Sequence, residues 1–103
     1  MTPVIRFSGN AAGNLKEAMR LVGVLNQYLP MLTQLINSGL DHWSAWQRVL
    51  QTFNAQHGQD AQLHQNVPPA ARTPVYWYAW DPYSRRLRVA TYGPNGMPVW
   101  ASQ

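Results

Sequence analysis

Residues 75–80, Val-Tyr-Trp-Tyr-Ala-Trp, begin the stretch that decides the fold. A turn at 81–84, Asp-Pro-Tyr-Ser, leads into Arg-Arg-Leu-Arg-Val-Ala-Thr-Tyr at 85–92, and a second turn at 93–96, Gly-Pro-Asn-Gly, leads into Met-Pro-Val-Trp at 97–100. Short runs rich in aromatic and β-branched residues, separated by proline-containing turns, predict a three-stranded antiparallel β-meander. A meander this small does not fold alone, so the rest of the chain is expected to pack against it.

Three helices are predicted before the meander, and each has its own boundary residues. Asn14, followed three residues later by Glu17, gives the capping-box pattern at the start of a first helix that is apolar over much of its circumference. Such a helix is expected at the centre of the fold or against a second chain. Pro30 suits the start of a short second helix that Gly39 closes, and Asp41 caps a third helix that runs to about residue 57.

The predicted fold class is therefore α+β, with a helical hairpin and a third helix packed on the small sheet. We expect one domain over residues 1–103: a mainly helical part at 1–58, a Pro/Gln-rich surface linker at 59–74 and the meander at 75–103. Residues 4–7, Val-Ile-Arg-Phe, are a short strand that is expected to add an edge to the sheet.

The register of the two hairpins decides which aromatic side chains are buried, because side chains alternate between the faces of a strand. The second turn favours a three-residue loop that places Thr91 opposite Val99 and Ala90 opposite Trp100. The first loop is ambiguous. An even loop places Trp80 opposite Arg85. It turns three side chains toward the core, which are Tyr76, Tyr78 and Trp80, and leaves Trp77, Arg86, Arg88 and Trp100 on the outer face. An odd loop instead turns Tyr76, Tyr78 and Trp80 outward.

We favour the even loop, since Ser84 is a poor residue for the left-handed position that an odd loop needs. The outer face then combines aromatic rings with arginines. Simple surface cation–π pairs, or cover by residues 1–8 or by the linker, are the alternatives to a binding surface at this place.

Charge and cysteine content exclude few classes. Charged residues make up 12% of the chain, against about 25% in typical proteins, and the net charge of +4 arises from eight basic and four acidic residues. The basicity reflects a shortage of acids, and nucleic-acid binders usually concentrate more positive charge. The chain has no cysteine, so it has no disulfide and no thiolate metal site.

The start of the chain lacks a basic segment followed by an apolar core, and no apolar run approaches the roughly 20 residues that span a bilayer. We therefore expect a soluble protein without a signal peptide and without membrane insertion, in the cytoplasm or in a particle.

No motif for catalysis or cofactor binding is found. Residues 9–13, Gly-Asn-Ala-Ala-Gly, lack the Gly-Lys-Ser/Thr ending of a phosphate loop. His57, Asp60 and His64 are the one metal-like cluster, but they lie in and beside a Gln-rich linker that does not hold a fixed geometry. Paired carboxylates and a recognisable triad are also lacking. The sequence predicts no enzyme, no cofactor, no metal and no small-molecule substrate.

The sequence instead favours a non-catalytic protein-interaction or assembly module that binds a protein partner or a second copy of itself. Trp and Arg are the residues most enriched at binding hot spots. Small subunits or adaptors of larger particles, such as viral or mobile-element ones, fit the size and low charge. The predicted partner-binding residues are Trp77, Arg85, Arg86, Arg88, Tyr92 and Trp100.

Two nucleic-acid alternatives remain. In the first, the domain binds single-stranded nucleic acid, with arginines on phosphates and Tyr76, Tyr78 and Trp80 stacked on bases. In the second, residues 38–40 form the turn of a helix-turn-helix-like DNA-binding unit, whose exposed polar side chains would read bases or phosphates. Those side chains are His42, Ser44, Gln47, Arg48 and Gln51.

Overall fold

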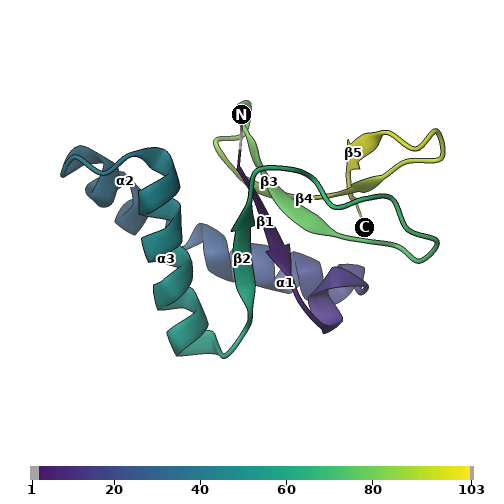
Figure 1. The fold of residues 1–103 in the computed structure, drawn as a ribbon, viewed down its shortest axis with the longest axis horizontal. Helices are drawn as coiled ribbons and strands as arrows, with labels where there is room; N and C mark the ends of the chain where they lie inside the picture. Colours follow the sequence, from purple (N-terminus) through teal and green to yellow (C-terminus); the bar gives the residue numbers. More distant parts are fainter. Residues whose placement is uncertain (1–2, 103) are drawn as a thin grey trace.

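The protein consists of three helices and one antiparallel sheet. The computed structural model describes residues 3–102 and has three α-helices and five strands in that part of the chain (Figure 1). The helices are α1 (Leu15–Asn26), α2 (Leu29–Asn37) and α3 (His42–His57), and a short 3-10 turn, η1, spans Asn10–Ala12. The strands are β1 (Val4–Phe7), β2 (Ala61–His64), β3 (Trp77–Asp81), β4 (Arg86–Tyr92) and β5 (Pro98–Trp100).

The predicted helix starts are confirmed. The Asn14 side chain accepts a hydrogen bond from the Glu17 N–H (3.2 Å), and the Asp41 side chain accepts one from the Ser44 N–H (3.4 Å). Helix α3 ends at Gly58, whose φ of 66° lies in the left-handed region that favours glycine. Helix α2 begins at Leu29, slightly earlier than predicted, with Pro30 in its first turn.

The fold class is α+β, as predicted, but the sheet has five antiparallel strands instead of three, in the order β2-β1-β3-β4-β5. Residues 61–64, inside the predicted linker, form β2: Ala61 and Leu63 are buried and Gln62 is exposed. Because β2 pairs with one side of β1 and β3 with the other, β1 lies inside the sheet. The prediction that β1 is an edge strand is wrong.

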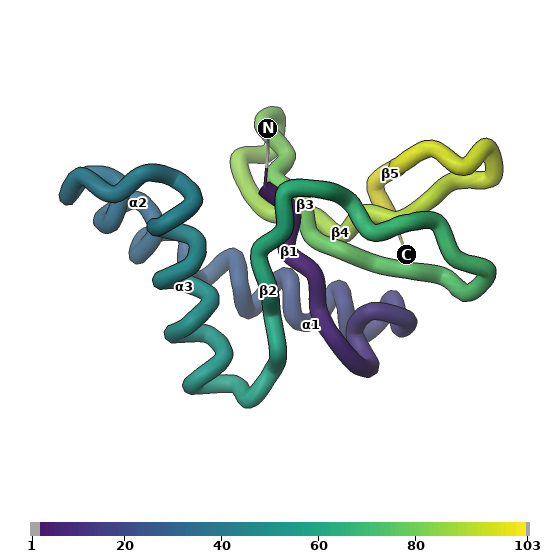
Figure 2. The backbone as a smooth tube through the Cα atoms, in the orientation of Figure 1, coloured from purple at the N-terminus to yellow at the C-terminus, as the bar shows by residue number. Residues whose placement is uncertain are grey.

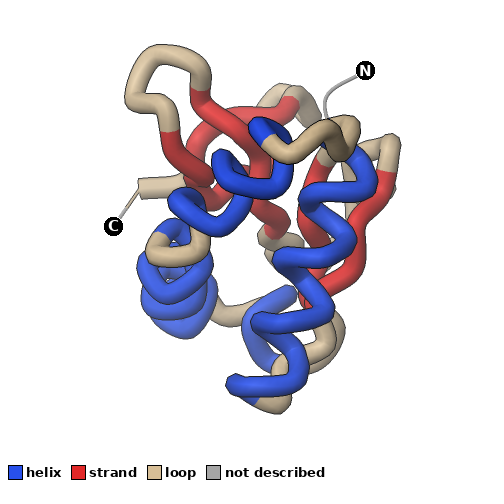
Figure 3. Tube along the Cα trace, turned by 90° about the vertical axis from the view of Figure 1, so that its left-hand side faces the viewer, coloured by secondary structure: helices blue, strands red, loops and turns tan. Residues whose placement is uncertain are grey.

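The helices pack on one face of the sheet, which we call the inner face. The views in Figures 1 and 3 place the helices together on this side of the strands. The core contains Leu21 and Leu25 from α1 and Val49 and Phe53 from α3. The sheet contributes the inward residues of all but β5, which are Ile5, Phe7, Ala61, Leu63, Tyr78, Leu87 and Val89.

The hairpin registers place the residues of the opposite, outer face. In the second hairpin Thr91 lies opposite Val99 and Ala90 opposite Trp100, as predicted. The first hairpin has an even, four-residue loop at 82–85, but Trp80 lies opposite Leu87, so the predicted pairing with Arg85 is wrong by two residues.

This shift arises because Asp81 ends strand β3 instead of opening the turn. Its side chain accepts hydrogen bonds from the Tyr83 N–H (2.9 Å) and the Ser84 hydroxyl (2.9 Å). The left-handed residue of the loop is Arg85, with a φ of 55°. The parity of the loop, and hence the face that each aromatic side chain occupies, is as predicted.

Two asparagines pair with backbone groups on parts of the sheet that no further strand covers, which are β2 and the start of β4. Asn54 of α3 accepts a hydrogen bond from the Ala61 N–H (2.9 Å) and donates to the Ala61 carbonyl (3.0 Å). Asn26, at the end of α1, accepts one from the Leu87 N–H (2.8 Å) and donates to the Leu87 carbonyl (3.0 Å). Each side-chain amide thus replaces one residue of a neighbouring strand, and edge groups that would otherwise attract another chain are paired.

None of the large exposed hydrophobic side chains within residues 3–102 belongs to a helix. Leu21, Val22 and Leu25 of α1 are buried, and Val24 and Tyr28 pack against the core. The apolar circumference of α1 therefore reflects its central position, and the alternative of a face for a second chain is not needed to explain it. Within residues 3–102, none of the helices is long and apolar enough to span a membrane.

Candidate interaction surface

The outer face of the sheet carries a row of side chains that crosses four strands. Arg6 of β1 lies opposite Trp77 of β3, Trp77 opposite Ala90 of β4, and Ala90 opposite Trp100 of β5. Since alternate residues of a strand share a face, Arg86, Arg88 and Tyr92 belong to the same side. All the predicted partner-binding residues that belong to strands, which are Trp77, Arg86, Arg88, Tyr92 and Trp100, therefore lie on one face.

Residues 65–76, which we call the covering segment, pass over part of this face. Figure 2 shows the segment leaving β2, passing in front of β3 and β4 on the side away from α1, and returning into β3. Three side chains of the sheet hold it, each by donating to one of its carbonyls. The donor–acceptor pairs are Arg6 to Asn66 (2.8 Å), Thr91 to Val75 (2.9 Å) and Tyr92 to Pro68.

The cover divides the predicted binding residues into two groups. Trp77 is 1% exposed and packs with Val4, Ala90 and Val75, while its ring centroid lies 5.0 Å from that of Tyr92. Trp77 thus lies on the predicted face, but the expectation that its ring is open to a partner is wrong, because the linker covers it. Tyr92 is half-buried, since its hydroxyl holds the segment.

Trp100 is the aromatic residue of this face that stays open, with 38% of its surface exposed. The guanidinium carbon of Arg88 lies 4.9 Å from the centroid of its ring, a cation–π contact that typically contributes ~0.5–1 kcal/mol. Arg88 also donates to the Asp81 carboxylate (3.1 Å), so its orientation over the ring is fixed from both sides. Arg85 and Arg86 are exposed, in the turn and at the start of β4.

A groove of about 330 Å³ opens beside Trp100, and we call it the Trp100 groove. One wall is the covering segment, through Val67, and the opposite wall is strand β5. Val67 and Trp100 are each about two-fifths exposed, so the apolar lining is accessible. The full lining is Val67, Trp77, Ala79, Ala90, Pro98, Val99 and Trp100.

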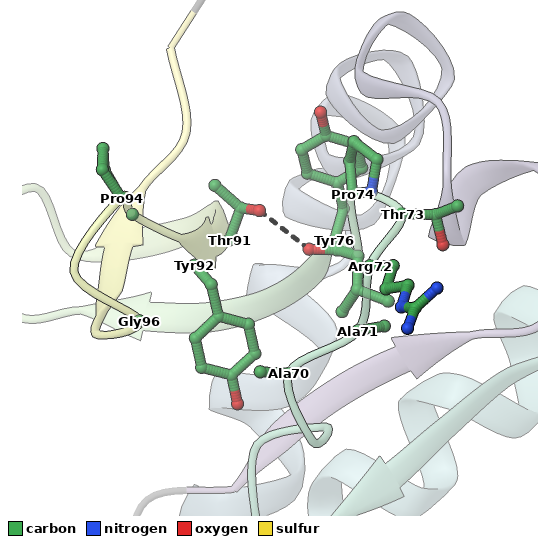
Figure 4. Close-up of a pocket in the computed structure, with 12 residues that line it drawn as sticks. Ala70, Ala71, Arg72, Thr73, Pro74, Tyr76, Thr91, Tyr92, Pro94 and Gly96 are labelled. Carbon is green, nitrogen blue, oxygen red and sulfur yellow. Dashed lines mark hydrogen bonds between the residues drawn. The ribbon is translucent and has the colours of Figure 1, made fainter.

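A second opening, a slot of about 460 Å³, separates residues 70–76 of the covering segment from the β4–β5 hairpin. Figure 4 shows the Tyr92 ring at one end of this slot, the bond from Thr91 to the Val75 carbonyl across it, and Arg72 extending away from Tyr92. The covering segment therefore bridges to the sheet at a few points and leaves space on both sides of the bridge.

Asp81 is the one buried acidic side chain among the described residues. Burial raises the pKa of Asp81, but hydrogen bonds from the Tyr83 N–H, Arg88 and the Ser84 hydroxyl more than offset this effect, so its pKa lies below the ordinary value. A lowered carboxyl pKa stabilises the folded state above the unfolded pKa, and this contribution is lost as the pH falls through the folded pKa.

Asp81→Asn is therefore expected to lower the thermal unfolding temperature at pH 7, because the amide has no charge for Arg88 and accepts fewer hydrogen bonds. The difference from wild type should be smaller at pH 3 than at pH 7, because below the ordinary aspartate pKa of about 4 the unfolded wild type takes up a proton that the folded carboxyl excludes. A difference that is the same at both pH values would show that the charge of Asp81 contributes nothing.

The alternative stacking residues do not reach the outer face. Tyr78 is buried among the helices, donates to the Ala18 carbonyl, and has its pKa raised by burial. Tyr76 and Trp80 also pack against the helical core. The inward position of Tyr76, Tyr78 and Trp80 agrees with the favoured even loop, and the alternative that places them beside the arginines, which needs an odd loop, is wrong.

The residues of the metal-like cluster have separate partners. His57 lies 3.1 Å from the Tyr28 hydroxyl, and Asp60 accepts a hydrogen bond from the Ser8 hydroxyl (3.0 Å). Partial burial, and then the charge of Arg6, lower the pKa of His64. No group of three His, Asp or Glu side chains suited to a metal ion occurs within residues 3–102.

The charge is distributed unevenly between the two layers. Residues 8–60, which include the helices, contain three basic and three acidic side chains. Residues 4–7 and 61–102, which form the sheet and its cover, contain five basic and one acidic, so the whole formal charge of +4 lies there. The exposed polar residues of α3, with Arg48 as their one cation, belong to the neutral layer. This distribution disfavours the helix-turn-helix alternative.

Sequence reasoning did not find Val67 and Pro98 as parts of the surface. The available signal was weak: Val67 is one of two large aliphatic residues in the Gln-, Ala- and Pro-rich stretch 59–74. An isolated apolar residue in such a stretch is consistent with a contact to the domain, but does not identify that contact.

Comparison with known proteins adds no further assignment: no family model, no curated protein and no solved structure matches this chain.

Proposed function

We propose that this protein is a non-catalytic interaction module, a small subunit or adaptor, that contacts a protein partner through the Trp100 groove. The observation that carries the proposal is the exposure of Trp100 at the end of the sheet, with Arg88 fixed over its ring. Trp and Arg dominate binding hot spots when they lie beside an apolar pocket that a partner can fill. The groove offers such a pocket, and Arg88 lies over the ring of Trp100, which lines it.

The other large exposed hydrophobic residues agree with this location. Within the described part of the chain they are Val67, Tyr83, Met97, Val99 and Trp100, and all but Tyr83 belong to the covering segment or to the β4–β5 hairpin. Concentration of exposed apolar side chains in one region is typical of an interaction site.

Trp100→Ala is expected to weaken the partner complex by at least about 2 kcal/mol, the threshold of a hot spot, with little change in the unfolding midpoint. Arg86→Ala should weaken it less, because Arg86 lies on the same face of β4 but does not line the groove. Tyr83→Ala is the matched control: it removes an aromatic ring that is 96% exposed in the β3–β4 turn.

The partner can be found by replacing Trp100, or Tyr83 as control, with a photo-crosslinking phenylalanine analogue. A protein adduct formed from position 100 but not from position 83 supports the proposal, and light scattering over a range of concentrations shows whether this adduct is a second copy. Equal adducts from both positions, or none, contradict it.

The uneven charge favours one second candidate, binding of single-stranded nucleic acid to the same face. Affinity for an oligonucleotide would then fall steeply with salt, because each phosphate contact releases counterions. Solution mass measured with and without oligonucleotide separates the candidates. We expect no oligonucleotide complex at physiological salt, since one open ring does not provide the successive stacking surfaces that such binding uses.

A further inference from the structure

The outer face already binds one extended segment of this chain by a recognisable mode. The covering segment is neither helix nor strand, and includes Pro68 and Pro69. Side-chain donors of the sheet reach its carbonyls, and aromatic rings lie beneath it, with Tyr92 both packing on Trp77 and donating to Pro68. Domains that bind polyproline-type segments use this combination of an aromatic surface and donors to carbonyls.

A partner cannot readily add to the sheet as another strand. Asn54 occupies the backbone groups of Ala61 on β2. On the β5 side, the Gly93 N–H donates to the Met97 carbonyl and the Ala101 N–H donates to the Val89 carbonyl. Because backbone groups of successive residues point to opposite sides of a strand, those of Pro98 and Trp100 point away from β4. Pro98 has no N–H, so the outward side of β5 lacks a donor that strand addition needs.

The Trp100 groove repeats the components that hold the covering segment. It has an open aromatic ring with Arg88 over it and apolar walls, and Val67, the neighbour of Pro68 in the covering segment, forms one of these walls. All of the net positive charge lies in the layer that forms this face, and Arg86 makes no ion pair within residues 3–102. A ligand with acidic groups is therefore complementary to it.

We propose that the Trp100 groove binds an extended, proline-containing segment of a partner protein that carries acidic side chains. The proline rings pack on Trp100 and between Val67 and Pro98, and the carboxylates meet Arg86 and Arg88. The segment lies alongside residues 65–70 without pairing with a strand. This inference rests on the proposed function, because it specifies the partner of the same groove.

The test is fluorescence anisotropy of the whole protein with labelled peptides made of Glu-Pro-Pro-Val repeats. Two matched peptides separate the contributions: Glu-Ala-Ala-Val repeats keep the charge without proline, and Lys-Pro-Pro-Val repeats keep proline with the opposite charge. We expect each matched peptide to bind at least about tenfold more weakly than the first.

Variants locate the binding on the groove. Trp100→Ala should weaken the Glu-Pro-Pro-Val peptide by about tenfold or more, and Tyr83→Ala should leave it unchanged. Val67→Glu should weaken binding of this peptide and strengthen binding of the Lys-Pro-Pro-Val peptide, because it adds a negative charge to one wall of the groove. Circular dichroism of each variant shows that it is folded.

Three outcomes overturn the inference: no binding of the Glu-Pro-Pro-Val peptide, equal binding of the alanine peptide, or binding that Trp100→Ala does not change. If a protein adduct still forms from position 100 in any of these cases, the proposed function as an interaction module is retained, and acidic proline-containing segments are excluded as its partner. Preferential binding of a single-stranded oligonucleotide in the same assay would instead overturn both.

Discussion

Trp77→Ala is expected to lower the free energy of unfolding by about 3–5 kcal/mol, the range for truncating a large buried aromatic side chain. The side chain is 1% exposed and contacts Val4, Ala90 and Tyr92 beneath the covering segment. Its loss leaves a cavity between the sheet and the segment, which is attached at few other points. The measurement is equilibrium unfolding in urea.

Trp100→Ala is the matched control for this experiment, since it removes the same side chain from the same row of the sheet. It should cost less than about 1 kcal/mol, because Trp100 is 38% exposed, against 1% for Trp77, and its cation–π contact with Arg88 contributes only ~0.5–1 kcal/mol. Trp77→Phe keeps a ring in place and should lose less free energy of unfolding than Trp77→Ala. It provides the measurement if the alanine variant does not fold. Similar losses for the two alanine variants would mean that the cover does not bury Trp77.

Asn26→Ala and Asn54→Ala are each expected to lower the free energy of unfolding by about 2–3 kcal/mol, because each leaves a buried backbone N–H and a buried carbonyl without a partner. The residues that lose their partners, Leu87 and Ala61, are both buried. The two asparagines pair with β2 and β4, which are not neighbours in the sheet, so the losses should add in the double variant. Urea unfolding measures all three.

Asn37→Ala is the control, because Asn37 is exposed at the end of α2, and the change should stay within about 0.5 kcal/mol. The edge variants should also self-associate more than wild type, since an open strand edge is a template for pairing. If Asn26→Ala and Asn54→Ala lose as little free energy of unfolding as Asn37→Ala, water must satisfy the backbone groups of Leu87 and Ala61 as well as the asparagines do.

Local signals in the sequence were sufficient for much of the fold. Asn14, Asp41 and Gly58 mark helix boundaries by bonds within a few residues, and Gly96 fixes the second hairpin through its left-handed conformation. The parity of the first hairpin could also be predicted, but its register could not. The Asp81 side chain organises the turn from inside the strand, and the residue types of the turn do not reveal this.

The rest depends on contacts between distant parts of the chain. Strand β2 has only Ala61 and Leu63 as its inward residues, and it is stable because Asn54 and β1 pair with it on its two sides. This pairing also makes β1 an interior strand. Neither effect is visible in the residues of β2 themselves.

The same limit applies to the candidate site. Alternation along the strands places Trp77 and Trp100 on one face, and nothing within the meander distinguishes them. The covering segment does so, through bonds from Arg6 and Tyr92 to carbonyls that any sequence would offer. The sequence could therefore predict the face but not which half of it stays open.

Every proposal about partners depends on this division of the outer face into a covered half around Trp77 and an open half around Trp100. Its most direct test is the effect of a soluble paramagnetic agent on the relaxation of the tryptophan indole N–H protons, assigned by single Trp→Phe variants. We expect strong relaxation enhancement at Trp100 and little at Trp77. An enhancement at Trp77 as large as that at Trp100 would contradict the division, and the groove beside Trp100 would no longer be the distinct binding surface of this protein.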